Sequence, residues 1–147
     1  MGQAGPLDLA ALVAAAGDAI VVADAEGHIR LWNAAAERIF GFPAADVLGQ
    51  SLDLIIPERY RARHWDGYRE VMQTGVTRYG AEVLRVPALR ENGQRISIAF
   101  TVALLKGADG RVTAIAAIVR DETQRWEEEQ RLRRRLAELE RKTPPDE

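Results

Sequence analysis

The alternation of apolar and polar residues before the charged end of the chain constrains the fold more than any other feature of the sequence. Residues 94–105 and 111–121 alternate in this way and are rich in β-branched residues, and residues 79–90 alternate in part. The dipeptide Asn92-Gly93, a strong hairpin signal, separates two of these runs, and a glycine turn at residues 107–110 separates the next two. The sequence therefore predicts a three-stranded antiparallel meander.

The first half of the chain predicts two more strands and several short helices. Residues 19–33 indicate a hairpin, with a β-branched run before a turn at residues 24–27. Asn33 is a suitable cap for a helix that Gly41 ends, Pro57 is suited to begin a helix, and Gly75 is suited to close it. Strands that flank a helical middle favour an α+β domain with the helices packed on one face of the sheet.

Both ends of the chain predict flanking helices. Apolar residues at helical spacing run from Leu7 to Val13, and Gly17 ends them, so residues 1–17 form an N-terminal flanking helix. Residues 18–121 form the domain, and residues 122–147 contain a charged helix outside the core. Leucines at 132, 136 and 139 have the spacing of a short coiled coil, so we expect a homodimer, although a solvated helix that frays explains the same pattern.

Composition excludes several classes of function. The 147 residues include no cysteine, which rules out disulfides, thiolate metal sites and cysteine nucleophiles. The net charge of −2 gives no reason to expect a nucleic-acid partner. No apolar run is long enough to span a bilayer, and no basic signal-peptide region is present, so we expect a cytoplasmic protein without a membrane partner. The sequence does not identify an output partner.

Four separated motifs resemble those of one known family. They are WNAAAERIFGF at residues 32–42, VLGQSLDLIIPE at 47–58, RENGQRISIAFTVA at 90–103 and VRDETQ at 119–124. Together they resemble a PAS domain over residues 8–124. The resemblance implies a five-stranded antiparallel sheet with short helices on one face, and a module that senses signals or mediates dimerisation.

His64, one of two histidines, is the main candidate for a cofactor ligand. Tyr60, His64 and Tyr68 share one face of the predicted helix. A half-buried histidine satisfied by one hydrogen bond would fit this pattern. The chain also resembles the haem-binding oxygen-sensor PAS domains of the FixL and Dos type, which carry the proximal histidine on this helix. That resemblance implies haem b held by His64, with a diatomic gas as ligand.

The same resemblance implies the rest of a haem site. Tyr68 lies beside the ligand, two arginines are candidates to pair with the propionates, and strand residues form the opposite wall. The arginines are Arg69 and Arg78, and the wall residues are Glu82, Leu84, Phe100 and Val102.

This wall departs from the family pattern at two positions. Leu84 replaces an arginine that stabilises bound oxygen, and Glu82 replaces an apolar or methionine residue. A leucine offers no hydrogen bond, so we expect weak oxygen stabilisation and a preference for carbon monoxide, nitric oxide or redox change. A register shift of one residue would place Arg85 inside instead.

Other readings of the sequence remain open or are weaker. A PAS module without a cofactor, filled by its own side chains, is the main alternative. A flavin beside Trp32 or Asn33 is a further one. Glu58, Asp66 and Glu70 lie near His64, but on so charged a helix they indicate a solvated face. We therefore expect no enzyme, and the absence of phosphate-loop patterns from the sequence disfavours nucleotide hydrolysis.

Overall fold

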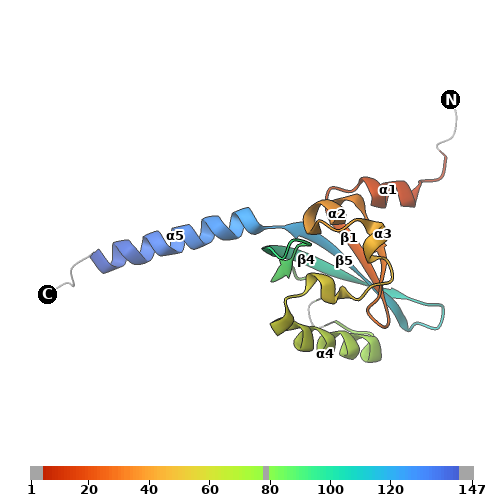
Figure 1. The fold of residues 1–147 in the computed structure, drawn as a ribbon. Helices are drawn as coiled ribbons and strands as arrows, with labels where there is room; N and C mark the ends of the chain where they lie inside the picture. Colours follow the sequence, from red (N-terminus) through yellow and green to blue (C-terminus); the bar gives the residue numbers. More distant parts are fainter. Residues whose placement is uncertain (1–4, 78–79, 143–147) are drawn as a thin grey trace.

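The protein folds into a five-stranded antiparallel sheet with helices, seen in a computed structural model that describes residues 5–77 and 80–142. The strand order is β2-β1-β5-β4-β3, and Figure 1 shows the long helix α5 extending away from this domain. The elements in chain order are α1 (Leu9–Ala15), β1 (Ala19–Asp24), β2 (Ile29–Trp32), α2 (Ala34–Phe40), α3 (Ala44–Val47), the 3₁₀ turn η1 (Leu52–Ile55), α4 (Glu58–Thr74), β3 (Leu84–Leu89), β4 (Arg95–Lys106), β5 (Val112–Asp121) and α5 (Thr123–Lys142).

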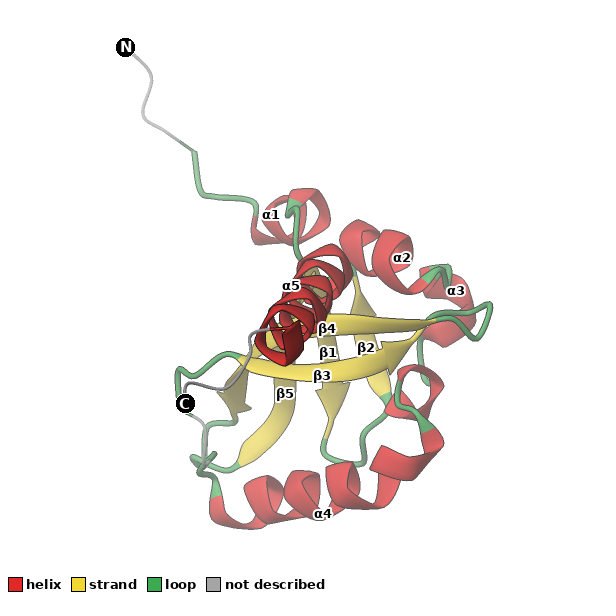
Figure 2. Cartoon of the chain, turned by 90° about the vertical axis from the view of Figure 1, so that its left-hand side faces the viewer, coloured by secondary structure: helices red, strands yellow, loops and turns green. Residues whose placement is uncertain are grey.

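One face of the sheet, which we call the inner face, packs against the helices. A single buried cluster joins Val21 and Val119 of the sheet to Phe40 of α2, Val47 of α3 and Tyr68 of α4. Figure 2 shows α4 running along one side of the sheet and α2 and α3 lying near β2. The expected α+β class, with a five-stranded antiparallel sheet and helices on one face, is therefore confirmed.

Small residues let α2 approach the sheet closely. Ala35 and Ala36 of α2 are fully buried, as are Ala19 and Ala23 of β1. A helix and a strand that meet through methyl groups leave little volume between their backbones. The position of α2 is therefore set by its close contact with β1, the second strand of the sheet.

Asn33 joins three elements through its side chain. Its Oδ1 accepts hydrogen bonds from the backbone N–H of Ile20 at 2.9 Å and of Ala36 at 3.0 Å. Its Nδ2 donates to the carbonyl oxygens of Val13 at 2.9 Å and Asp18 at 3.1 Å. Asn33 is the one buried polar or charged residue in the described part of the chain, and all its donors and acceptors are satisfied. It therefore caps α2 and holds β1 and the end of α1 together.

The helix α4 docks on the first hairpin through two aromatic residues. The Tyr68 hydroxyl donates a hydrogen bond of 2.6 Å to the carbonyl oxygen of Asp24, at the end of β1. The Trp65 ring covers Gly27, which lies in the hairpin turn with a φ of +83°. A Cβ atom at this glycine would overlap the indole ring of Trp65, so the turn tolerates neither a side chain nor an ordinary backbone conformation here.

Residues 80–83 correct one expectation about the sheet. The alternating pattern predicts a strand over residues 79–90, but β3 begins only at Leu84. Ladder pairing with β4 starts at Leu84 opposite Phe100 and ends at Leu89 opposite Arg95. The expected strand at residues 80–83 was therefore wrong, because partial alternation does not show where a pairing partner begins.

Replacing Asn33 tests its role in stability. Asn33→Ala removes four hydrogen bonds and leaves buried backbone groups without partners, so the free energy of unfolding should fall by roughly 3 kcal/mol or more. Chemical denaturation measures the loss. Asn92→Ala is the control, because that side chain accepts one bond from Gln94 in an exposed turn. An equal loss in the two variants would contradict this role.

A pair of glycine variants tests the contact between Trp65 and the hairpin. Gly27→Ala adds a methyl group against the indole and strains the backbone, so we expect a loss of roughly 2–4 kcal/mol in unfolding free energy. Gly49 has a similar φ of +85° but nothing within 4 Å of a Cβ, so Gly49→Ala should lose only about 1 kcal/mol. If both variants lose the same, backbone strain alone explains the effect at Gly27.

Candidate functional site

His64 lies on the face of α4 that is directed to the core. It stands one helical turn before Tyr68, which is buried in the core cluster, and one turn after the half-buried Tyr60. Arg63 and Asp66, on the other side of the helix, are exposed. The predicted stripe of Tyr60, His64 and Tyr68 is therefore present, with its most buried member at the hairpin end.

The His64 ring lies against two aromatic rings. Its centroid lies 4.7 Å from that of Trp65 in an edge-on arrangement and 5.7 Å from that of Tyr68. Its Nδ1 is buried and has no hydrogen-bond partner. Buried polar atoms in folded proteins nearly always have a partner, so an orphaned ring nitrogen at this position calls for an explanation.

Burial sets the protonation state of His64. Loss of hydration lowers the pKa of the imidazole below its ordinary value of 6.5, and the carboxylate of Asp53 opposes this in part. Burial also raises the pKa of Tyr68, with the charges of Asp24 and Glu26 adding to the effect. Near neutral pH His64 is therefore an uncharged imidazole, which is the form that binds a metal ion.

Three of the predicted wall residues lie on the inner face of the sheet. Phe100 packs against the core cluster, and Leu84 is paired directly with it across β3 and β4. Val102 is paired with Ala117, which is also the partner of the buried Val21. Directly paired residues in an antiparallel ladder point to the same face. All three side chains are half-buried, so the apolar wall is not completely covered by the protein's own atoms.

The ladder also decides between Leu84 and Arg85. Leu84 stands opposite Phe100 and Arg85 stands opposite Ala99, so the two side chains point to opposite faces. Arg85 is exposed. The register shift that would place Arg85 inside does not occur, and the inner position belongs to leucine.

Two other predicted site residues, Glu82 and Arg69, are not part of this arrangement. Glu82 is exposed and precedes β3, so its expected place in the wall is wrong. Arg69 is exposed, and its guanidinium donates a 2.6 Å hydrogen bond to the carboxylate of Asp66. Arg78 lies outside the described residues. The core therefore has His64 and Tyr68 on its helix side, and Leu84, Phe100 and Val102 on the inner face of the sheet.

Two residues that the sequence reasoning missed hold this end of α4 in place. The Trp65 indole N–H donates to the Asp53 carboxylate at 2.8 Å, which ties α4 to the turn η1. The Arg61 guanidinium donates to the backbone carbonyls of Ile56 and Asp53. A buried tryptophan usually needs a hydrogen-bond acceptor for its indole N–H, so the sequence could have predicted that Trp65 has a partner. The spacing of residues does not identify that partner as Asp53.

Trp32 and Asn33, considered as flavin neighbours, already have structural partners. The Trp32 indole N–H donates to the carbonyl oxygen of Phe42 at 3.0 Å, and the ring is buried against Phe40. Asn33 uses its whole amide in the network around α2. Neither side chain has a polar group to spare for a ligand.

The end of the sheet is joined to α5 by a compact set of hydrogen bonds. The Asp121 carboxylate accepts from both the backbone N–H and the hydroxyl of Thr123. The Thr123 hydroxyl accepts from the Ser97 N–H at 3.0 Å, and the Ser97 carbonyl accepts from the Glu122 N–H at 2.8 Å. The first turn of α5 is therefore fixed to β4, the strand that also carries Phe100 and Val102.

The described residues contain no helix with the length and apolarity needed to cross a membrane.

Similar proteins include the sensor protein FixL of Bradyrhizobium diazoefficiens, 29% identical over 83% of this chain. The oxygen sensor protein DosP of Escherichia coli is 26% identical over 69% of this chain. The chain spans 24% and 12% of the lengths of these two relatives.

Comparison with solved structures supports the same fold. The PAS domain of a protein from Colwellia psychrerythraea superposes with a TM-score of 0.69 at 21% identity, covering 79% of this chain and 95% of that domain. The family model described as the PAS fold matches residues 13–127. By this match over most of its length, the chain belongs to the PAS family.

Proposed function

We propose that this domain is a sensor that holds haem b through His64 and responds to a diatomic gas or to a change of redox state. The observation that carries the proposal is the buried, unpartnered Nδ1 of an uncharged imidazole on the core side of α4. Membership in the PAS family and similarity to proteins named as sensors support the sensing role. The resemblance to haem-binding PAS domains supports the choice of cofactor.

The residues around His64 are of the types that a haem site uses. A neutral imidazole is a common axial ligand of haem iron, and a rigid helix holds it in one orientation. The half-buried Leu84, Phe100 and Val102 offer an apolar surface on the sheet. Bound haem supplies a redox-active iron with a coordination position that is open to a small ligand.

The chain's own residues orient the imidazole and carry the response outward. The bonds from Trp65 to Asp53 and from Tyr68 to Asp24 fix the helix on both sides of His64. Leu84 places no hydrogen-bond donor on the inner face, which favours carbon monoxide, nitric oxide or redox change over oxygen as the signal. Arg69 is exposed and paired with Asp66, so it has no part in the proposed site.

A displacement of the wall would reach α5 through β4. Phe100 and Val102 lie on the same strand as Ser97, whose backbone bonds hold Glu122 and Thr123. A shift of β4 by a fraction of an ångström changes these bonds directly, because no flexible loop separates them from the wall. In this proposal the sheet is the path from the haem to the exit helix.

Haem titration of two histidine variants tests the proposal. Purified protein mixed with haemin should develop a Soret band, and His64→Ala should lose it because the axial ligand is gone. His28→Ala is the matched control, since His28 is the other histidine of the chain and its side chain is half-exposed in the first hairpin. It should retain the wild-type spectrum.

The alternative of a PAS module without a cofactor gives a different result. Wild-type protein that takes up no haem, or a Soret band that His64→Ala leaves unchanged, would overturn the assignment of His64. Circular dichroism of each variant checks that the fold is retained, so that loss of the band is not mistaken for unfolding.

Burial of neutral His64 also predicts a pH dependence of stability in protein without haem. Because the folded-state pKa lies below 6.5, the unfolded chain binds more protons in the interval between the two values. The free energy of unfolding should therefore fall as the pH falls below 6.5, by at most about 1.4 kcal/mol per pH unit.

Denaturation at a series of pH values measures this slope. His64→Phe should have a shallower slope below pH 6.5 than the wild type, because it removes the group that takes up the proton. His28→Phe controls for the loss of a histidine as such. Equal slopes in wild type and His64→Phe would show that His64 is not buried in its neutral form.

A further inference from the structure

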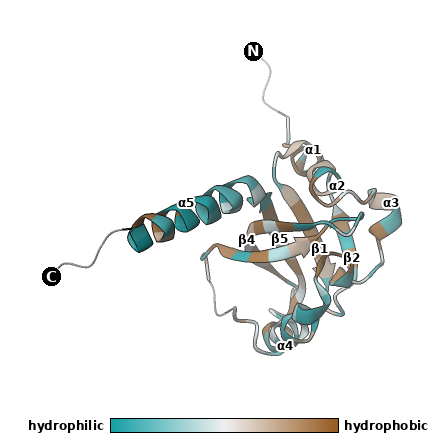
Figure 3. Ribbon diagram, turned by 60° about the vertical axis from the view of Figure 1, so that its left-hand side comes forward, coloured by the Kyte–Doolittle hydropathy of each residue, from teal (hydrophilic) through white to brown (hydrophobic). Residues whose placement is uncertain are grey.

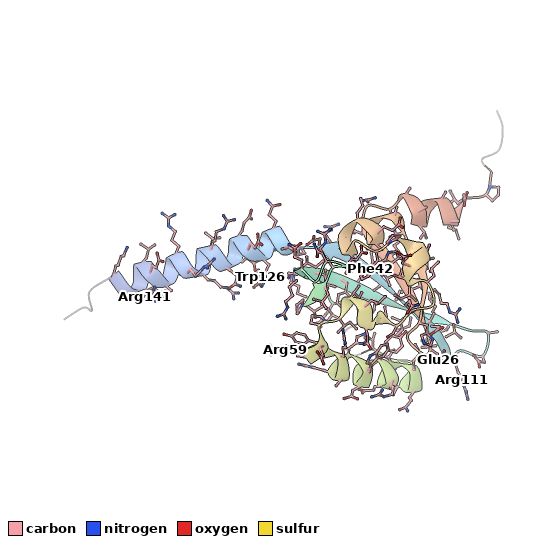
Figure 4. The ribbon with its side chains drawn as sticks, in the orientation of Figure 1. Glu26, Phe42, Arg59, Arg111, Trp126 and Arg141 are labelled. Carbon is pink, nitrogen blue, oxygen red and sulfur yellow. The ribbon has the colours of Figure 1, made fainter. Side chains whose placement is uncertain are left out.

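The strand β3 is the open edge of the sheet. In the order β2-β1-β5-β4-β3 the two edge strands are β2 and β3. The β2 edge is covered, because Ile29 exchanges backbone hydrogen bonds with Gly49 and Gln50. Among the residues that the structure describes, none forms such a bond on the outer side of β3. Figure 3 shows α5 as a largely hydrophilic helix that extends away from the domain, and Figure 4 shows its side chains, from Trp126 to Arg141.

Two hydrogen bonds show which backbone groups of β3 face this open edge. The Arg90 N–H, just after β3, donates to the Gln94 carbonyl at 3.0 Å, so even-numbered residues of β3 bond toward β4. The Ser97 carbonyl of β4 accepts from the Glu122 N–H, so odd-numbered residues of β4 bond away from β3. The two bonds agree. The residues of β3 that present their backbone to the open edge are Arg85, Pro87 and Leu89.

A proline occupies the middle of these three positions. Proline has no N–H, and its ring takes the space of the missing donor. The β3–β4 ladder loses nothing by this, because the N–H of residue 87 would point away from Ser97, its partner in the register. Prolines within sheets are confined to positions of this kind. Pro87 therefore fits the fold and removes the central donor of the open edge.

In other respects the β3 edge is suited to accept another strand. The strand has 6 residues, which is an ordinary length for pairing. Val86 is 39% exposed, and Val83, just before the strand, is 49% exposed. Arg85 is the one charged residue of β3. An exposed edge with apolar side chains is a template for pairing with another chain, and a second copy of this chain carries the same template.

We infer that Pro87 closes the β3 edge to strand addition by a second copy of this chain. An antiparallel pair centred on residue 87 would place Arg85 opposite the partner's Leu89, and each such pair would exchange two hydrogen bonds. The central pair would consist of two prolines and would have no donor. Their two rings would also meet where the strands must approach each other. This inference does not depend on haem.

Amide hydrogen exchange in the unmodified protein tests the direction of the backbone groups. The N–H groups of Arg85 and Leu89 should exchange at least roughly tenfold faster than those of Val86 and Ala88, because only the latter two donate within the ladder. Exchange followed by NMR resolves the four amides. Equal protection of all four would show that the β3 edge is already covered and would overturn the inference.

Replacing the proline tests its role directly. Pro87→Val restores the central donor in a residue that favours strands, so the full chain should associate as its concentration rises. Sedimentation equilibrium should then give roughly twice the mass of the wild type at the same concentration. Exchange at Arg85 and Leu89 should slow with the same concentration dependence. A wild-type mass together with unchanged exchange at both amides would refute the role of Pro87.

Two further variants separate the missing donor from the apolar surface. Arg85→Val removes the charge of the edge and adds apolar surface, but it keeps Pro87 and should retain the wild-type mass. Arg85→Pro combined with Pro87→Val removes a different outward donor and should weaken the association of Pro87→Val several-fold. Circular dichroism checks that each variant is folded. If Arg85→Val associates as strongly as Pro87→Val, or if the double variant does, apolar surface governs the edge and the inference is wrong.

Discussion

The rest of the domain depends on the side-chain amide of Asn33. Its four hydrogen bonds meet where α1 ends, β1 begins and α2 starts. With β1 fixed in this way, its far end at Asp24 offers a backbone carbonyl to Tyr68, and its turn offers Gly27 to the Trp65 ring. Asn33 holds β1 in place, and the contacts of α4 with the end of β1 then set the position of α4 and of His64. A buried amide is tolerated here because each of its donors and acceptors has a partner.

Much of the fold could be predicted because its signals are local. Asn33 as a cap, Gly41 and Gly75 as helix ends and Asn92-Gly93 as a turn act within a few residues, and the structure has each of them in that role. The start of β3 could not be predicted in the same way. Whether residues 80–83 pair with another strand depends on a partner distant in sequence, and alternation carries no information about that partner.

The helix side of the candidate site could be predicted from the sequence, but the strand residues of the wall could be predicted less well. Helical periodicity alone places His64 beside Tyr60 and Tyr68 on the core side of α4. The wall depends on strand register, in which one residue decides between Leu84 and Arg85, and only the ladder with β4 settles this. The hydrogen bond from Trp65 to Asp53 depends on the path of the chain through η1, which local sequence signals do not determine. The ion pair of Arg69 with Asp66 is one of several that the charged residues of α4 permit, so the sequence did not single it out.

The strand β4 connects the two halves of the proposed function. It carries Phe100 and Val102 on the inner face, and at Ser97 it holds the first residues of α5. A strand is stiff along its length, so a change at the wall is passed to the junction, whereas an exposed loop would absorb it.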